Sequence, residues 1–232
     1  MEAVRRVAPG TVLVSGGASG LGAAIVALLR KDGTRVVSLD LRSTGDEDSI
    51  VVDVADPGAA ENVVRLVAER EGGLAGLVTA AGTDACGRLD SVLRDDWERV
   101  LRVNLLGTAA LVRAAIPWLE RSRGRIVTVA STLGLRALSD ASAYCASKFG
   151  VVGFTRALAV ELAGRVGVTL LIPGGMRTAF FDDRPERYRP GPDAELLDPD
   201  DVARCVHFAL TQPDGCEIRE LLVCASTEPS WP

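Results

Sequence analysis

The sequence has little histidine and lysine, and its cysteines follow no spacing typical of metal or disulfide chemistry. His207 is the only histidine, and Lys31 and Lys148 are the only lysines in 232 residues. A single histidine excludes a histidine-rich zinc site, and a place on a predicted helix face argues against a catalytic role. The five cysteines are odd in number and include no Cys-x-x-Cys pair. We therefore predict reduced, buried thiols and no metal site.

An excess of positive charge is also absent. The chain carries 26 Lys and Arg residues against 31 Asp and Glu residues, a net charge of −5. This balance leaves no basic footprint for nucleic acid and no polybasic patch for a membrane surface. The most apolar stretch, residues 105–119, is interrupted by Arg113 and is too short to span a bilayer, and residues 1–10 contain no signal-peptide core. We predict a cytoplasmic protein that binds neither nucleic acid nor membrane.

Short apolar runs alternate with longer helical patterns along the whole chain. The predicted strands are residues 11–16, 35–40, 49–54, 74–82, 124–131, 166–175 and 218–224. The predicted helices are residues 21–33, 57–73, 95–122, 142–163 and 199–213. Continuous apolar strands separated by helices indicate an α/β fold with a parallel sheet covered on both faces. We predict one Rossmann-like, doubly wound domain of about seven strands over residues 1–232, with residues 177–197 as a substrate-binding loop or lid.

A glycine-rich turn follows the first predicted strand. Gly16, Gly20 and Gly22 in "SGGASGLG" lead into the first predicted helix. Glycines at this place let the backbone approach a pyrophosphate, and the helix N-terminus attracts its charge. Asp40 ends the second predicted strand, where a carboxylate accepts hydrogen bonds from an adenosine ribose and repels a 2′-phosphate. The pattern favours NAD, and NADP stays open because Arg42 follows closely. Asp53 at the end of the third strand is placed to meet the adenine edge.

The spacing between Tyr144 and Lys148 explains the position of Lys148, one of the only two lysines. In a helix over "SAYCASKFGVV" the two side chains share one face, four residues apart. An ammonium beside a phenol favours the phenolate, so we predict a pKa of Tyr144 below its usual value near 10. A phenol tuned in this way exchanges a proton with an alcohol or ketone oxygen.

Two further polar residues are placed to complete the site. Ser131 ends the fifth predicted strand, and ligands gather beyond the carboxyl ends of parallel strands, so its hydroxyl is expected beside the same substrate oxygen. Asn104 is a poor helix former inside the apolar run "VLRVNLLGTAALV". We interpret it either as a locally bonded amide or as the holder of a water that links Lys148 to solvent.

Together these motifs resemble the classical short-chain dehydrogenase/reductase family over nearly the whole chain. The match includes "DVAD" at Asp53, "AAG" ending at Gly82, "YCASK" and "PGGMRT" at residues 173–178. The resemblance implies a catalytic tetrad of Asn104, Ser131, Tyr144 and Lys148, an NAD or NADP cofactor and a small-molecule substrate. It also implies that Thr178 contacts the nicotinamide carboxamide. The cofactor-binding residues expected from the motifs and the resemblance are Ser15, Gly16, Ser19, Gly20, Leu21, Gly22, Asp40, Asp53, Val54, Ala81, Gly82, Tyr144, Lys148, Pro173, Gly174, Met176 and Thr178.

The sequence departs from the family at two places. The usual "NNAG" after the fourth strand reads "TAAG", with Thr79 and Ala80 in place of both asparagines, which puts the hydrogen-bond brace of this turn in doubt. The last strand lacks the frequent Asp-Gly-Gly ending and runs into "CASTEPSWP", where Trp231 is expected to pack on a neighbouring subunit.

Several functions agree with this pattern. The leading prediction is an oxidoreductase that transfers a hydride between a nicotinamide cofactor and a secondary alcohol or ketone, with tyrosine as general acid/base. Alternatives are an NADPH-dependent ketoreductase of an acyl or polyketide-like chain, and a dinucleotide-sensing regulator without turnover. The long helices over residues 96–120 and 142–163 are rich in small apolar side chains, and by analogy with the family we expect a homodimer or homotetramer.

Overall fold

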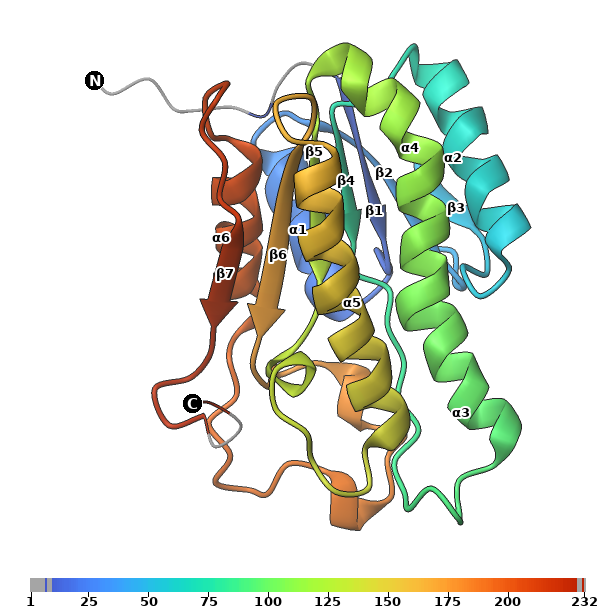
Figure 1. The fold of residues 1–232 in the computed structure, drawn as a ribbon, viewed down its shortest axis with the longest axis vertical. Helices are drawn as coiled ribbons and strands as arrows, with labels where there is room; N and C mark the ends of the chain where they lie inside the picture. The colour runs from blue at the N-terminus through green and yellow to red at the C-terminus, as the bar shows by residue number, and fades with distance from the viewer. Residues whose placement is uncertain (1–6, 8–9, 229–230, 232) are drawn as a thin grey trace.

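The computed structural model describes residue 7, residues 10–228 and residue 231. Seven parallel strands form one sheet in the order β3-β2-β1-β4-β5-β6-β7, which confirms the predicted doubly wound fold (Figure 1). The strand order reverses between β1 and β4, which creates a crevice at the carboxyl ends of these two strands. The strands are β1 Thr11–Ser15, β2 Arg35–Asp40, β3 Ser49–Val51, β4 Gly76–Thr79, β5 Arg125–Val129, β6 Gly167–Pro173 and β7 Glu220–Val223.

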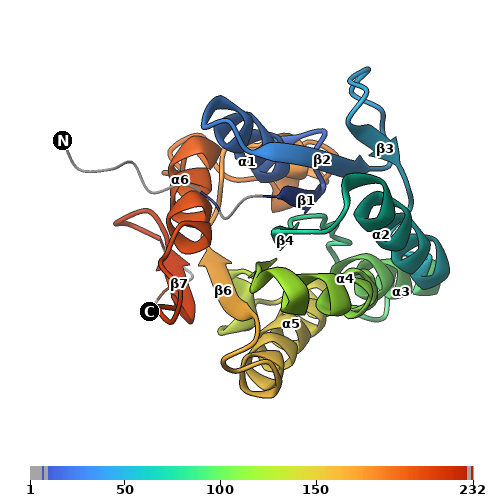
Figure 2. The ribbon, with the colours of Figure 1, turned by 90° about the horizontal axis from the view of Figure 1, so that it is seen from above.

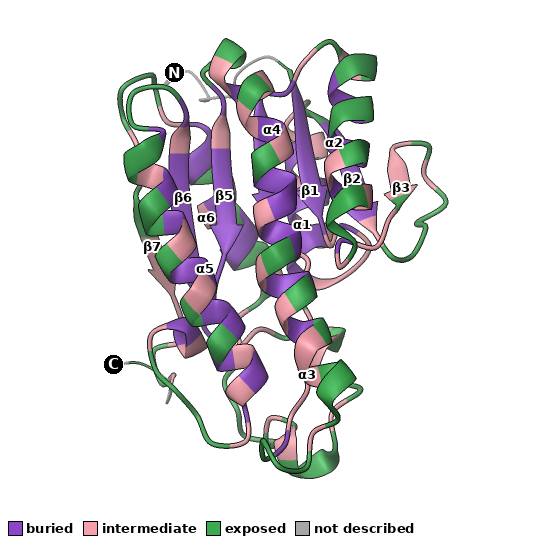
Figure 3. Ribbon diagram, turned by 45° about the vertical axis from the view of Figure 1, so that its right-hand side comes forward, coloured by how far each residue is buried: buried purple, intermediate pink, exposed green. Residues whose placement is uncertain are grey.

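Helices cover both faces of the sheet. Helices α1 and α6 lie side by side on one face, and α2, α4 and α5 cover the other (Figure 2). Each layer has its own apolar core against the sheet, and the central strands are buried on both faces (Figure 3). The helices are α1 Gly20–Lys31, α2 Pro57–Glu71, α3 Arg94–Leu101, α4 Thr108–Ser122, α5 Ser142–Glu161 and α6 Pro199–Leu210.

The helix ends follow from local sequence chemistry. The Asp56 carboxylate accepts a hydrogen bond from Ala59 N at the start of α2, Pro57 occupies its first turn, and Gly72 ends it in the left-handed region at φ 75°. Helix α6 begins in the same way, with the Asp198 side chain as its N-cap and a proline as its first residue. These signals place the predicted helix boundaries within a few residues of those observed.

The predicted continuous helix over residues 95–122 is wrong in one respect. It is interrupted by a π-helical segment, Arg102–Gly107, that separates α3 from α4 and contains Asn104. Thr108 Oγ1 donates to Asn104 O at 2.9 Å, and a Cβ on Gly107 would lie only 2.5 Å from Val54 O. Close packing of Gly107 on the turn after β3 therefore coincides with the π-helical segment, a feature that often occurs at functional sites.

The loops at the carboxyl ends of the strands gather at one end of the molecule, at the bottom of Figure 1. Residues 177–197 include two short 3₁₀ turns, Ala179–Phe181 and Glu186–Tyr188, and the base of this loop is closed by hydrogen bonds between Arg177 N and Leu197 O and between Leu197 N and Gly175 O. Its tip is held where the Tyr188 hydroxyl donates to Asp140 at 3.1 Å. The loop thus has defined structure and lies over the strand ends.

The five cysteines differ in their exposure. The prediction of buried cysteines holds only for Cys145, because Cys216 is exposed and the other three thiols are half-buried. All five are free, and the only histidine, His207, lies 3.1 Å from the Asp32 carboxylate. By length and composition alone the helical stretch Arg94–Ser122 is long and apolar enough to cross a membrane, but half of its most apolar part is buried inside the fold, as in a core helix.

Candidate active site

A cleft of about 1410 Å³ opens along the carboxyl ends of the strands, across the point where the strand order reverses. The glycine-rich turn, the ends of β2, β4, β5 and β6, the start of α5 and the 177–197 loop all contribute to its wall. Pockets for one small ligand usually measure about 300–1,000 Å³. The cleft therefore has room for a dinucleotide together with a substrate.

The glycine-rich turn leaves no room for side chains. Gly16 adopts φ 73°, and a Cβ there would lie 2.7 Å from Ala81 N on the neighbouring strand end. A Cβ on Gly22 would lie 2.0 Å from Gly16 O, so the first turn of α1 contacts the loop directly. Gly20 adopts φ 52° and faces Thr178. The free amide groups at this helix start border the cleft, an arrangement that binds phosphate groups.

At one end of the cleft two carboxylates line the wall. Asp40 Oδ2 accepts a hydrogen bond from Ala18 N at 3.0 Å, and its Oδ1 accepts one from Arg42 N at 3.1 Å. Asp40 therefore braces the glycine-rich turn as well as lining the cleft. Asp53 Oδ1 accepts from its own turn, and Asp53 Oδ2 forms an ion pair with Arg99 of α3 at 3.2 Å.

Helix α5 brings Tyr144 and Lys148 to the same wall, as the four-residue spacing predicts. Lys148 Nζ lies 5.6 Å from the centre of the Tyr144 ring and donates a hydrogen bond to Val129 O at the end of β5. Lys148 is buried and Tyr144 is half-buried. The ammonium is thus fixed below the ring, between the helix and the sheet.

The predicted lowering of the pKa of Tyr144 is wrong for this structure. Burial raises the pKa of Tyr144 to about 12, and a hydrogen bond with the Ser131 hydroxyl opposes that rise only in part. Burial also lowers the pKa of Lys148 to about 8, with Asp84 acting in the opposite direction. Loss of water is the largest cause of both shifts, and the Lys148 ammonium donates its hydrogen bond to the Val129 carbonyl. The phenol stays protonated at neutral pH.

Ser131 and Asn104 occupy different layers of the site. Ser131 lines the cleft directly after β5, and its hydroxyl accepts from Leu133 N at 3.2 Å. Asn104 is buried behind the wall: its Oδ1 accepts from Thr83 N at 2.8 Å, and its Nδ2 donates to Thr83 O at 2.9 Å and to Ser147 Oγ at 3.0 Å. Asn104 therefore fixes the segment after β4, and its role as a water holder stays a prediction.

The turn after β4 is braced by the end of β1. Ser15 Oγ accepts a hydrogen bond from Ala81 N at 3.2 Å, and Ser15 O accepts one from Ala80 N. The Thr79 hydroxyl is buried without a hydrogen-bond partner among the described residues. Ser15 at the end of β1 therefore supports this turn with both its side chain and its backbone carbonyl.

The structure brings the predicted site residues together with two exceptions. Ser15 and Asn104 lie behind the wall, and all the other predicted catalytic and cofactor-binding residues line the cleft. Asp84 and Arg184 also line it and were not predicted. Asp84 stands two residues after Gly82, a position that could have marked it, whereas nothing in the sequence singles out Arg184 among the charges of its loop.

The residues present fit a dinucleotide. A single cleft contains all the parts that such a cofactor needs. They are the glycine-rich turn, which a Cβ would fill, the adjoining helix N-terminus, the Asp40 carboxylate at the end of β2, and Thr178 across from Gly20.

Known proteins resemble this chain over nearly its whole length. Residues 10–189 match the family model described as short chain dehydrogenase. An uncharacterised oxidoreductase of Staphylococcus aureus (strain MW2) is 32% identical over 224 residues, covering 91% of this chain and 95% of that protein. The ligand-free aldohexose dehydrogenase of Thermoplasma acidophilum has a TM-score of 0.82 at 26% identity, covering 93% of this chain and 92% of that one. A candidate NAD(P)-dependent gluconate 5-dehydrogenase of Beutenbergia cavernae, with NADP bound at low occupancy, has a TM-score of 0.82 at 31% identity, covering 94% and 96%.

Proposed function

The chain belongs to the short-chain dehydrogenase family and is an NAD(P)-dependent oxidoreductase, and we propose that it interconverts a secondary alcohol and a ketone with Tyr144 as the general acid/base. The observation that carries this proposal is the convergence of the Tyr144 phenol, the Ser131 hydroxyl and the Lys148 ammonium on one cleft. The same cleft contains the glycine-rich turn. A proton donor and a dinucleotide cradle thus share one space.

The chain's residues have distinct parts in this reaction. The nicotinamide cofactor, when bound, supplies the hydride chemistry, and the protein supplies orientation and electrostatics. The Ser131 hydroxyl holds the substrate oxygen, and Tyr144 gives that oxygen its proton in reduction or removes it in oxidation. A phenol that stays protonated at neutral pH is the competent form for reduction. Below about pH 8 the Lys148 side chain is protonated, and its charge favours the supply of a new proton to Tyr144 after reduction.

The cofactor is proposed to be NAD rather than NADP. The Asp40 carboxylate at the end of β2 repels a 2′-phosphate and suits a free ribose hydroxyl. Arg42 also lines the cleft and weakens this preference. The most informative experiment measures oxidation of NADH and of NADPH with a panel of ketones, together with the reverse reaction on the matching alcohols. Turnover that prefers NADH is expected, and nucleotide binding without turnover of any carbonyl compound would favour the regulator instead.

The substrate is proposed to be a mid-sized, partly apolar carbonyl compound. Leu133, Leu138, Phe180 and Phe181 line the substrate side of the cleft, mixed with charged side chains. The Tyr188 hydroxyl of the same loop donates to Asp140 at 3.1 Å, which holds the loop tip. An acyl or polyketide-like ketone stays an alternative, and activity with NADPH and a β-ketoacyl thioester exceeding that with simple ketones would favour it.

The assembly is proposed to be a homodimer or homotetramer, and the location cytoplasmic. Phe149 and Val160 of α5 and Leu106 beside α4 are exposed apolar side chains on the helices expected to pair. Trp231 is exposed near the C-terminus, and we propose that it packs on a neighbouring subunit. Light scattering at micromolar concentration is expected to show a dimer or larger, and a monomer alone would contradict the proposal.

A further inference from the structure

A buried carboxylate outside the expected tetrad lies next to the proposed catalytic residues. The Asp84 side chain is only 5% exposed, and it raises the pKa of both Tyr144 and Lys148 by its charge. Its Oδ1 accepts from Ala85 N at 2.7 Å, and its Oδ2 accepts from the Cys86 thiol at 3.1 Å. A negative charge at this place opposes deprotonation of the phenol, so its compensation matters for the proton transfer.

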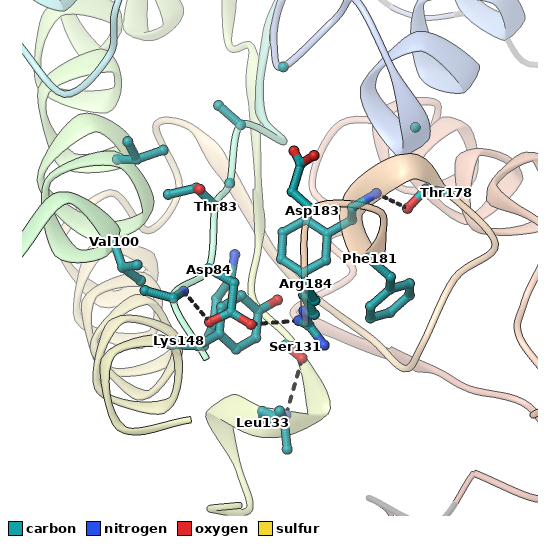
Figure 4. A pocket seen from close by; sticks show the side chains of 18 of the residues that line it. Thr83, Asp84, Val100, Ser131, Leu133, Lys148, Thr178, Phe181, Asp183 and Arg184 are labelled. Atoms are coloured by element: carbon teal, nitrogen blue, oxygen red, sulfur yellow. Dashed lines mark hydrogen bonds and ion pairs between the residues drawn. The ribbon is translucent and has the colours of Figure 1, made fainter. Parts of the chain in front are cut away.

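Arg184 of the 177–197 loop compensates that charge. Arg184 Nη2 lies 2.6 Å from Asp84 Oδ2, across a separation of 100 residues in the sequence (Figure 4). The guanidinium also lies over two rings of its own loop, 5.1 Å from the centre of Phe180 and 4.6 Å from that of Phe181. Phe180 in turn contacts the Tyr144 ring at 5.8 Å between centres. One loop residue therefore neutralises Asp84 and holds an aromatic cover on the phenol.

The ion pair is built in a way that permits opening. Its two side chains are 5% and 18% exposed, so forming it removes both charges from water. Arg184 Nε is buried without a hydrogen-bond partner among the described residues. A desolvated pair with an unsatisfied donor adds little net stability, whereas a single charge left behind in a closed site is unfavourable. The two groups are therefore stable in two arrangements, either paired inside the closed site or separated and hydrated. A loop that opens in each catalytic cycle requires two such arrangements.

We propose that the Asp84–Arg184 ion pair is the latch of the 177–197 loop, and that its closure both covers Tyr144 and neutralises Asp84 when the phenol must exchange its proton. Asp84 and Arg184 are positioning residues in this role, since they act through Tyr144 and Phe180. The inference rests on the proposed oxidoreductase function. The charged or titratable groups around the phenol come from three segments: Lys148 and Cys145 of α5, Asp84 and Cys86 after β4, and Arg184 of the loop.

The first test measures loop opening without any substrate. Trypsin does not cleave before proline, so within the loop tip it cleaves after Arg187 and not after Arg184 or Arg189. Arg187 is exposed but lies in the 3₁₀ turn Glu186–Tyr188, where Tyr188 O accepts a hydrogen bond from Arg184 Nη1. Cleavage after Arg187 requires this turn to unwind into an extended chain, so its rate reports the open population of the loop tip. We expect Asp84→Asn and Arg184→Met each to raise this rate at least about tenfold, and the double variant to raise it no further. Arg88→Met breaks the exposed pair with Asp90 and is the matched control, expected to leave the rate unchanged.

The second test is the pH dependence of ketone reduction. The basic limb is the fall in reduction rate at high pH, where the proton-donating group loses its proton. An uncompensated Asp84 raises the pKa of both Tyr144 and Lys148, so the limb moves in the same direction whichever of the two groups sets it. Arg184→Met is expected to move that limb about one pH unit upward and Asp84→Asn about one unit downward. Tyr188→Phe removes only the hydroxyl bond to Asp140 and keeps the Tyr188 carbonyl that accepts from Arg184, so it is expected to leave the limb in place.

The outcomes separate the latch from the proposed function. If the wild type reduces no carbonyl compound, the oxidoreductase proposal fails, and the trypsin comparison alone still decides the latch. If the wild type is active but the two single variants shift the limb in the same direction or not at all, or raise cleavage additively, the latch is wrong. Arg184→Lys keeps the charge and covers the case in which Arg184→Met does not fold. It is expected to retain the wild-type limb, and a shifted limb in this variant would also overturn the proposal.

Discussion

Replacing the proposed catalytic lysine is expected to stabilise the protein. Lys148 is buried, and its pKa is about 8 instead of the usual 10.5. The unfolded chain therefore binds the lysine proton more tightly than the folded chain does. Stability that is lost at neutral pH is regained as the pH rises from about 8 toward 10.5. Lys148→Met removes this titration while filling nearly the same space.

The size of the effect follows from the two pKa values. At pH 7 the lowered pKa of Lys148 corresponds to an unfavourable contribution of about 3 kcal/mol, which falls to about 2 kcal/mol at pH 9 and about 1 kcal/mol at pH 10. The variant also loses the hydrogen bond to Val129 O, worth about 1 kcal/mol at every pH. We therefore expect Lys148→Met to be about 2 kcal/mol more stable at pH 7 and about equal to the wild type at pH 10.

Urea unfolding of both proteins at pH 7, 8, 9 and 10 measures this difference. The raised pKa of Tyr144 lowers stability above pH 10 in both proteins, so it largely cancels in the comparison. Ketone turnover of the variant is expected to be lost although its fold is more stable. A stability difference that does not change with pH would refute the reasoning, because it would mean that the lysine keeps its ordinary pKa.

Three further predictions address the cofactor site and the assembly. Gly22→Ala places a Cβ 2.0 Å from Gly16 O and is expected to weaken NADH binding at least about a hundredfold in a fluorescence titration, whereas Gly153→Ala, with open space around it, leaves binding unchanged. Asp40→Ser is expected to raise the ratio of kcat/KM for NADPH to that for NADH at least about tenfold, and an unchanged ratio would contradict the ribose assignment. Deleting residues 226–232 is expected to reduce the assembly size or the melting temperature, and a truncated protein identical in both would rule out a role for Trp231.

Elements with a strong local signal could be predicted from the sequence. Continuous apolar runs marked every strand, and the caps at Asp56 and Asp198 marked the starts of two helices. Tyr144 and Lys148 share a face because helical periodicity alone requires it. The glycine-rich turn was also recognisable, because backbone atoms lie so close to Gly16 and Gly22 that no larger residue fits at either position.

Features that depend on distant parts of the chain were missed. The π-helical turn at Asn104 coincides with the packing of Gly107 against Val54 O, which no local pattern reports. The pKa of Tyr144 rises because the surrounding loops exclude water, an effect that helix spacing does not reveal. The Asp84–Arg184 pair joins residues 100 positions apart. Local sequence thus located the reactive groups, and the tertiary fold determines their charge.

The most direct test compares the wild type with Tyr144→Phe. The variant removes one hydroxyl oxygen and keeps the ring against Phe180. Isothermal titration gives the Kd for NADH, and stopped-flow single turnover gives the rate of ketone reduction. The Kd is expected to stay within about threefold while the rate falls at least about a thousandfold, within the range that general acid/base catalysis contributes. A variant that still reduces the ketone at nearly the wild-type rate would show that another group moves the proton.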